Sequence, residues 1–66
     1  MISTKPFFKY LRGKQISDKK AADITGVSYA TILKMHKENT FNTTILDKLC
    51  KGFGIGIENV IRYEPD

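Results

Sequence analysis

Apolar residues recur three and four positions apart along most of this 66-residue chain, and this spacing places side chains on one face of a helix. Over residues 4–13 the spacing is set by Phe7, Tyr10 and Leu11. Pro6 is tolerated there because the opening turn of a helix leaves its amides without helical partners in any case. These positions predict a first helix over residues 4–13.

Phe8 lies outside the apolar face of this helix, and its aromatic ring has two interpretations. The ring is either partly buried against a loop or part of an exposed patch for a partner. We favour partial burial.

Two short helices joined by a tight turn are predicted over residues 17–37. Ser17 can cap the first of them with its hydroxyl, and Gly26 can end it because a residue without a Cβ takes the left-handed conformation at little cost. Val27 then points inward and fixes the angle between the helices, and Ser28 caps the second helix.

The second of these helices has two unlike faces. Ile32 and Met35 lie three positions apart and are expected to join the core. The opposite face is expected to be free, and its residues are Tyr29, Ala30, Leu33, Lys34 and Lys37.

The remainder of the chain predicts a polar loop and two more helices. Phe41 is the loop residue expected to be buried, and Asn42 is a suitable cap for the fourth helix. Gly52 and Gly54 are expected to end that helix, and Gly56 to open a short last one. The apolar face of the fourth helix comprises Ile45, Leu46, Leu49, Cys50 and Phe53, and that of the last comprises Ile57, Val60 and Ile61.

This pattern resembles the helix-turn-helix of the XRE/Cro family of phage and bacterial repressors. The residues that carry the resemblance are Ala22 where the helices cross, Gly26 in the turn, Val27 after it, and Ile32 and Met35 beneath the second helix. Residues 46–66, LDKLCKGFGIGIENVIRYEPD, resemble the last two helices of a small single-domain branch of that family. The chain departs from the family pattern at Asp18, Ala21, Ile24 and Leu33.

We therefore expect an all-α fold without strands, in which one domain spans residues 1–66. The resemblance implies a compact bundle of about five short helices around a central helix-turn-helix, as in lambda-repressor-like DNA-binding domains. It also implies double-stranded DNA as the partner.

The composition favours a polyanionic partner and argues against a metal site and a membrane span. Eleven lysines and arginines against seven acidic residues give a net charge of +4, which suits a polyanionic partner without proving one. One cysteine and one histidine provide neither an internal disulfide nor a zinc site, so we expect no metal and no cofactor. No apolar run approaches the roughly 18 residues of a membrane span, and we expect a cytoplasmic protein. The resemblance implies that it is bacterial or phage-encoded and associated with the nucleoid.

Catalysis has little support in the sequence, and we expect the protein not to be an enzyme. The carboxylates avoid apolar stretches that raise a pKa toward that of a general acid, and no phosphate-cradling glycine motif occurs. His36 is either a phosphate contact when protonated or a half-buried flank of the core, and we favour the second interpretation.

DNA recognition assigns a role to each side of the second helix of the pair. Its free face is expected to meet base edges through Tyr29, Ala30, Leu33 and Lys34, of which all but Leu33 match positions that often do so in the family. The expected backbone contacts are Ser17, Lys19, Lys20, Ser28 and Thr31 on one side and Lys37, Asn39, Thr43 and Thr44 on the other. Any one of these lysines alone is equally well read as a solvated charge, but their arrangement around one helix favours contact.

The sequence also predicts protein partners, either a second copy of this chain or another protein. A single recognition helix reads few base pairs, so we expect a homodimer on an inverted-repeat operator, joined through the apolar segment 57–63. The alternative is a protein-interaction module that kept the fold and does not bind DNA. Leu33 and Ile24, with Asp18 nearby, are the residues that favour this alternative.

Overall fold

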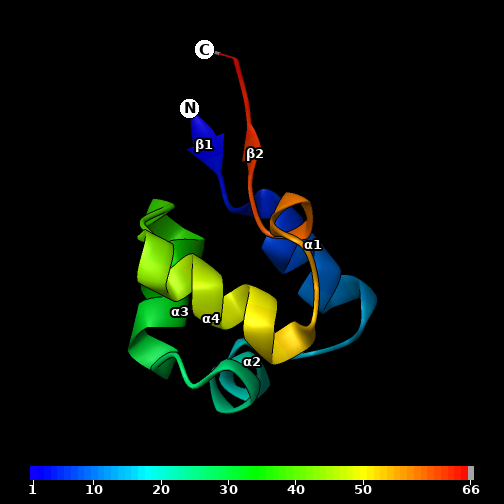
Figure 1. Ribbon diagram of the computed structural model, residues 1–66. Helices are drawn as coiled ribbons and strands as arrows, with labels where there is room; N and C mark the ends of the chain where they lie inside the picture. Colours follow the sequence, from blue (N-terminus) through cyan, green and yellow to red (C-terminus); the bar gives the residue numbers. More distant parts are fainter. Residues whose placement is uncertain (66) are drawn as a thin grey trace.

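The computed structural model describes residues 1–65, which form four α-helices and a two-stranded ladder that joins the ends of the chain (Figure 1). The helices are α1 (Lys5–Gly13), α2 (Asp18–Thr25), α3 (Tyr29–Glu38) and α4 (Thr43–Phe53). The strands are β1 (Ile2–Ser3) and β2 (Arg62–Tyr63), and a single 3₁₀ turn, η1 (Ile57–Asn59), precedes β2.

One apolar core holds the four helices together. Its most deeply buried side chains are Phe7 from α1, Ile32 and Met35 from α3, Leu49 from α4 and Val60 after η1. The helix α2 packs against both α3 and α4 and adds two small buried residues to this core. The predicted inward face of α3 is therefore confirmed.

Three helix starts follow the sequence closely. The side-chain oxygens of Ser17, Ser28 and Asn42 each accept a hydrogen bond from the amide three residues further on, at 3.1, 3.2 and 2.8 Å. Each such bond satisfies one of the amides that a helix start leaves without a partner. Gly26 ends α2 with φ +77°, which confirms its predicted left-handed conformation. Gly54 was predicted to end the fourth helix, and it ends α4 with φ +64°.

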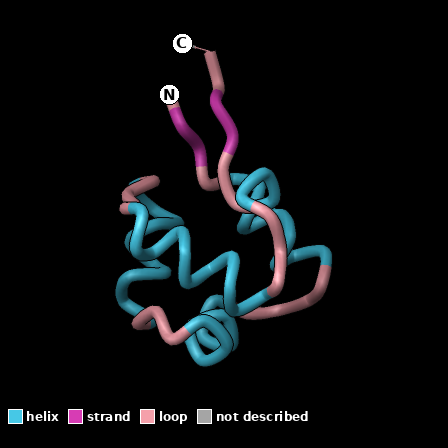
Figure 2. The backbone as a smooth tube through the Cα atoms, in the orientation of Figure 1, coloured by secondary structure: helices cyan, strands magenta, loops and turns pink. Residues whose placement is uncertain are grey.

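The prediction of five helices without strands is wrong at the carboxyl end. Residues 57–59 form only one 3₁₀ turn, and β2 then pairs antiparallel with β1, with Ile2 opposite Tyr63 and Ser3 opposite Arg62 (Figure 2). A segment this short cannot offset the unfavourable nucleation of an α-helix. Pairing with β1 instead satisfies backbone groups at both ends of the chain.

Asn39 ties this ladder to the end of α3. Its side-chain carbonyl accepts hydrogen bonds from the amide and the hydroxyl of Thr4, at 2.8 and 2.9 Å, and its NH₂ group donates to the carbonyl of Ile2 at 2.7 Å. Next to β2, the carboxylate of Glu64 accepts hydrogen bonds from the guanidinium of Arg62 at 2.9 and 3.2 Å, and these bonds lower the pKa of Glu64. The chain ends are thus fastened to the helix that carries the candidate interface.

The connection from α1 to α2 contains one strained residue. Gln15 has φ +59°, in the left-handed region that favours glycine. We expect Gln15→Gly to raise the free energy of unfolding by about 0.5–1 kcal/mol, measured by urea denaturation. The neighbouring Lys14 has φ −93°, so the control Lys14→Gly relieves no strain and is expected to be destabilising. Equal losses in both variants would contradict this explanation.

Candidate nucleic-acid interface

The turn between α2 and α3 is stabilised by hydrogen bonds of a threonine side chain as well as by the conformation of Gly26. The hydroxyl of Thr25 donates to the carbonyl of Ala21 at 2.8 Å and accepts a hydrogen bond from the amide of Val27 at 3.2 Å. Val27 is buried, as predicted, beneath the turn. These contacts fix the direction in which α3 leaves α2, although the sequence pattern alone did not indicate a role for Thr25.

The exposed face of α3 is a row of residues of mixed chemistry. Ala30, Lys34 and Lys37 are exposed, and the ring of Tyr29 is 46% exposed. Because Ile32 and Met35 are fully buried on the other face, this row is held outward by the core. A phenol, a methyl group and an ammonium group near the start and middle of a helix can contact base edges in a major groove.

Leu33 differs from the expectation for this row. Its side chain is half-buried rather than free, so it offers less apolar surface to a ligand than its place in the sequence indicates. In α2, by contrast, Ile24 is 39% exposed. The apolar part of the surface is therefore carried more by Ile24 and Tyr29 than by Leu33.

The residues expected to bind phosphate on one side of α3 belong to the starts of α2 and α3. Ser17, Lys19 and Lys20 are exposed at the beginning of α2, where the partial positive charge of the helix dipole also lies. At the start of α3 the hydroxyls of Ser28 and Thr31 lie 2.7 Å apart and share a hydrogen bond. This flank therefore combines two helix amino ends with two lysines.

The other flank brings together some, but not all, of the expected residues. Lys37, Thr43 and Thr44 are exposed, and α4 itself offers no partner to the amides of its first two residues, Thr43 and Thr44. Asn39 is half-buried, and its amide group holds Thr4 and Ile2. Its observed contacts therefore lie inside the fold.

His36 and Phe8 form a contact that the sequence pattern did not reveal. The imidazole stacks on the ring of Phe8 with centroids 4.1 Å apart and planes 12° apart. Its Nδ1 lies 3.2 Å from a carboxylate oxygen of Asp18. Phe8 is buried in the core rather than partly buried, and its ring stacks on His36 of α3 rather than on a loop, so the preference for burial is confirmed but its extent and partner were not predicted.

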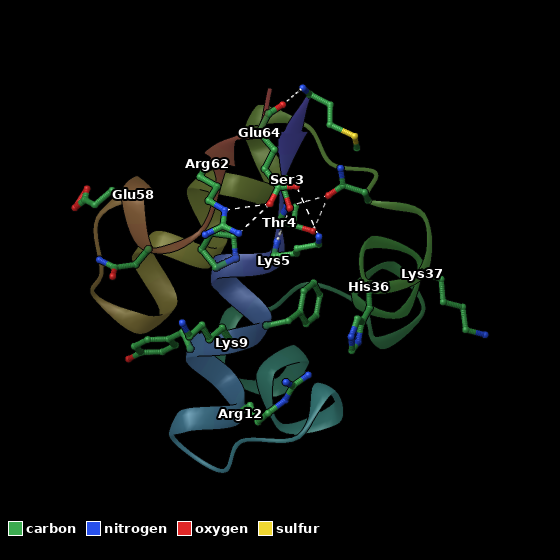
Figure 3. Close-up of a pocket in the computed structure, with 16 residues that line it drawn as sticks. Ser3, Thr4, Lys5, Lys9, Arg12, His36, Lys37, Glu58, Arg62 and Glu64 are labelled. Atoms are coloured by element: carbon green, nitrogen blue, oxygen red, sulfur yellow. Dashed lines mark hydrogen bonds and ion pairs between the residues drawn. The ribbon is translucent and has the colours of Figure 1, made fainter. Parts of the chain in front are cut away.

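A concavity of about 1030 Å³ adjoins this stack and is lined in part by cations of α1 (Figure 3). Lys9 and Arg12 face it from α1, and His36 and Lys37 face it from α3. Lys9 and Arg12 were not predicted as site residues, because a basic residue on an outer helix face has no local signal that separates a ligand contact from a solvated charge. Only the packing of α1 beside α3 brings them to this surface.

The other candidate groups show no comparable arrangement. Cys50 is half-buried, and burial raises the pKa of its thiol, with the nearby carboxylates of Asp47 and Glu58 acting in the same direction. A raised pKa keeps the thiol protonated and unreactive at neutral pH, in agreement with its expected role in the core. Within residues 1–65, no cluster of histidine, cysteine and carboxylate side chains has the form of a metal site, and no helix is both long and apolar enough to cross a membrane.

Comparison with known proteins agrees with this geometry. A family model described as the Cro/C1-type HTH DNA-binding domain matches residues 9–66. The match therefore includes most of α1, the whole helix-turn-helix and the segment through β2. No curated protein and no solved structure matches the chain.

Proposed function

Because this chain belongs to the family of Cro/C1-type HTH DNA-binding domains, we propose that it is a transcriptional repressor that reads double-stranded operator DNA with α3 in the major groove. The observation that carries the proposal is the exposed row on α3, which lies between exposed helix starts and lysines. The proposed unit is the single domain 1–66, without catalytic activity, in the cytoplasm of a bacterium or of a phage-infected cell.

Base reading is assigned to four residues of α3. Lys34 donates to the O6 and N7 acceptors of guanine, and Ala30 packs on a thymine methyl group. Tyr29 is exposed at the start of the helix, and it contacts a base through its hydroxyl or its ring. Leu33, being half-buried, adds only a small apolar contact at the edge of this row.

Backbone binding is assigned to the two flanks. Exposed side chains and helix amides neutralise or hydrogen-bond phosphates without reading sequence. The proposed contacts are Ser17, Lys19, Lys20, Ser28 and Thr31 on one flank, and Lys37, Thr43 and Thr44 on the other, with Asn39 holding the end of α3 in place.

We further propose that the protein binds an inverted repeat as a homodimer. The ladder has only two strands, so within residues 1–65 no further strand pairs with the outer edge of β2, whereas the side chain of Asn39 binds the carbonyl of Ile2 on β1. The cross-strand pair of Ile2 and Tyr63 is exposed. Ile57, which belongs to the same carboxyl-terminal segment, is also exposed. These features support a symmetric contact through segment 57–63 together with β1.

The first test is selection of bound fragments from a genomic pool, followed by sedimentation of the protein free and on the selected duplex. We expect an inverted repeat with half-sites about 10 base pairs apart and the mass of two chains on the duplex. Affinity is expected to fall steeply as salt rises, because bound phosphates release counterions. A single chain on the selected site would refute the dimer, and failure to enrich any sequence would refute specific recognition.

The alternative is a protein-interaction module, which the exposure of Ile24 and Tyr29 favours. Under this alternative the apolar side chains of the HTH surface bind another protein and the lysines around them keep the module soluble. The same selection separates the two functions, because a module of this kind enriches no DNA and shows no salt-dependent gel shift.

A further inference from the structure

His36 is held from two sides at the amino end of α2. The ring stacks on Phe8 from α1 at 4.1 Å, and Nδ1 lies 3.2 Å from the carboxylate of Asp18, the first residue of α2. The imidazole is 48% exposed and the Asp18 side chain only 23% exposed. The stacked and paired ring therefore has one nitrogen, Nε2, left for a ligand on its open side.

Asp18 poses an electrostatic problem for DNA binding at this position. The amino end of α2 attracts phosphate through its dipole and unpaired amides, but a carboxylate in the first turn repels it. A protonated His36 neutralises that carboxylate and adds an N–H donor beside it. A neutral His36 leaves the negative charge of Asp18 in place.

We propose that Phe8, His36 and Asp18 form a pH-dependent phosphate-binding point, at which protonated His36 cancels the charge of Asp18 and donates through Nε2 to the DNA backbone. This inference rests on the proposed DNA binding. It assigns His36 to the flank formed by the start of α2, and it makes affinity for DNA rise as pH falls.

The charged groups around His36 are lysines, arginines and carboxylates. Histidine changes charge between about pH 5 and 8, whereas lysine, arginine and surface carboxylates keep theirs over most of that range. His36 is the only histidine in the chain. The charged groups that face it or line the adjoining concavity are Asp18 from α2, Lys5, Lys9 and Arg12 from α1, Lys37 from α3, and Glu58, Arg62 and Glu64 from the carboxyl-terminal segment.

The test uses the full chain and a fluorescein-labelled duplex of arbitrary sequence, about 25 base pairs long, at about 50 mM salt, because phosphate contacts act on any sequence. We expect the affinity of the unaltered protein to be roughly 3- to 10-fold higher at about pH 5.5 than at about pH 7.5. His36→Gln is expected to abolish this difference. Asp18→Asn is expected to bind more tightly at about pH 7.5 than the unaltered protein does at the same pH, because it removes the carboxylate charge that repels phosphate.

Lys51→Gln is the matched control, since it removes an exposed charge at the far end of α4 and keeps the cluster intact. This variant is expected to keep the full pH response. Thermal unfolding of each variant at both pH values shows whether a change in DNA affinity reflects a loss of folding. If His36→Gln does not fold, the affinity of Asp18→Asn tests the proposal. Equal affinity of the unaltered protein at both pH values would overturn this inference but not DNA binding, whereas absence of binding at either pH would overturn both.

Discussion

Gly52→Val is expected to lower the free energy of unfolding by about 2–3 kcal/mol and the melting temperature by roughly 10–20 °C. Gly52 lies inside α4, where this helix crosses α2. A Cβ atom at this position would lie 2.9 Å from Cα and 3.0 Å from Cγ2 of Thr25, and 3.2 Å from the carbonyl oxygen of Ile24. Since two of these three atoms are backbone, the helices themselves must separate to admit a side chain.

Gly13→Val is the control for this prediction. Gly13 also lies at the end of a helix, as the last residue of α1, but nothing lies within 4 Å of a Cβ built on it. The same substitution there is expected to change the free energy of unfolding by less than about 0.5 kcal/mol. Urea denaturation of both variants measures the difference, and equal losses at the two positions would mean that the crossing of α2 and α4 tolerates a side chain.

Gly52 also marks a limit of what the sequence predicts. A glycine near the end of an apolar helical pattern is read as a helix terminator, and at Gly54 that interpretation is confirmed. At Gly52 it is wrong, because this glycine allows α4 to pack closely against Thr25 of α2, which lies 27 positions earlier in the chain. Caps and left-handed turns depend on neighbours in sequence and were predicted, whereas helix crossings depend on distant residues and were not.

The ladder between the chain ends was missed for the same reason. Each strand contains two residues, too few for an alternating pattern, and the paired segments lie at opposite ends of the sequence. Asn39, which fastens β1 to α3, was assigned to phosphate together with Lys37, Thr43 and Thr44. Its contacts with Ile2 and Thr4 become visible only when the amino-terminal segment is placed.

Some features of the candidate interface were also predicted from the sequence, and others were not. The outward row of α3 was predicted because residues three and four positions apart share a face, and the exposure of Tyr29, Ala30 and Lys34 confirms that geometry. The partial burial of Leu33 was not predicted. Neither was the stack of His36 on Phe8, which needs α1 to lie beside α3.

Lys34→Ala is expected to weaken binding to the selected operator by roughly 1–3 kcal/mol and to relax the preference for one base pair. Lys34 is exposed one turn beyond Ala30 on the row that faces away from the core, where an ammonium group can donate to a guanine edge. Binding to a scrambled duplex is expected to change much less. Titration of selected and scrambled duplexes measures both effects.

Lys37→Ala is the matched control, because it removes an equal charge from the same helix one turn further on. Lys37 lines the concavity beside α1 and projects away from that helix, near the end of α3 (Figure 3). If it meets phosphate, its loss weakens binding to all sequences about equally and lowers the salt slope by about one per half-site, since one fewer counterion is released. Equal, sequence-independent losses for both lysines would refute the base contact of Lys34. No effect from either would leave the interaction module as the better account of this face.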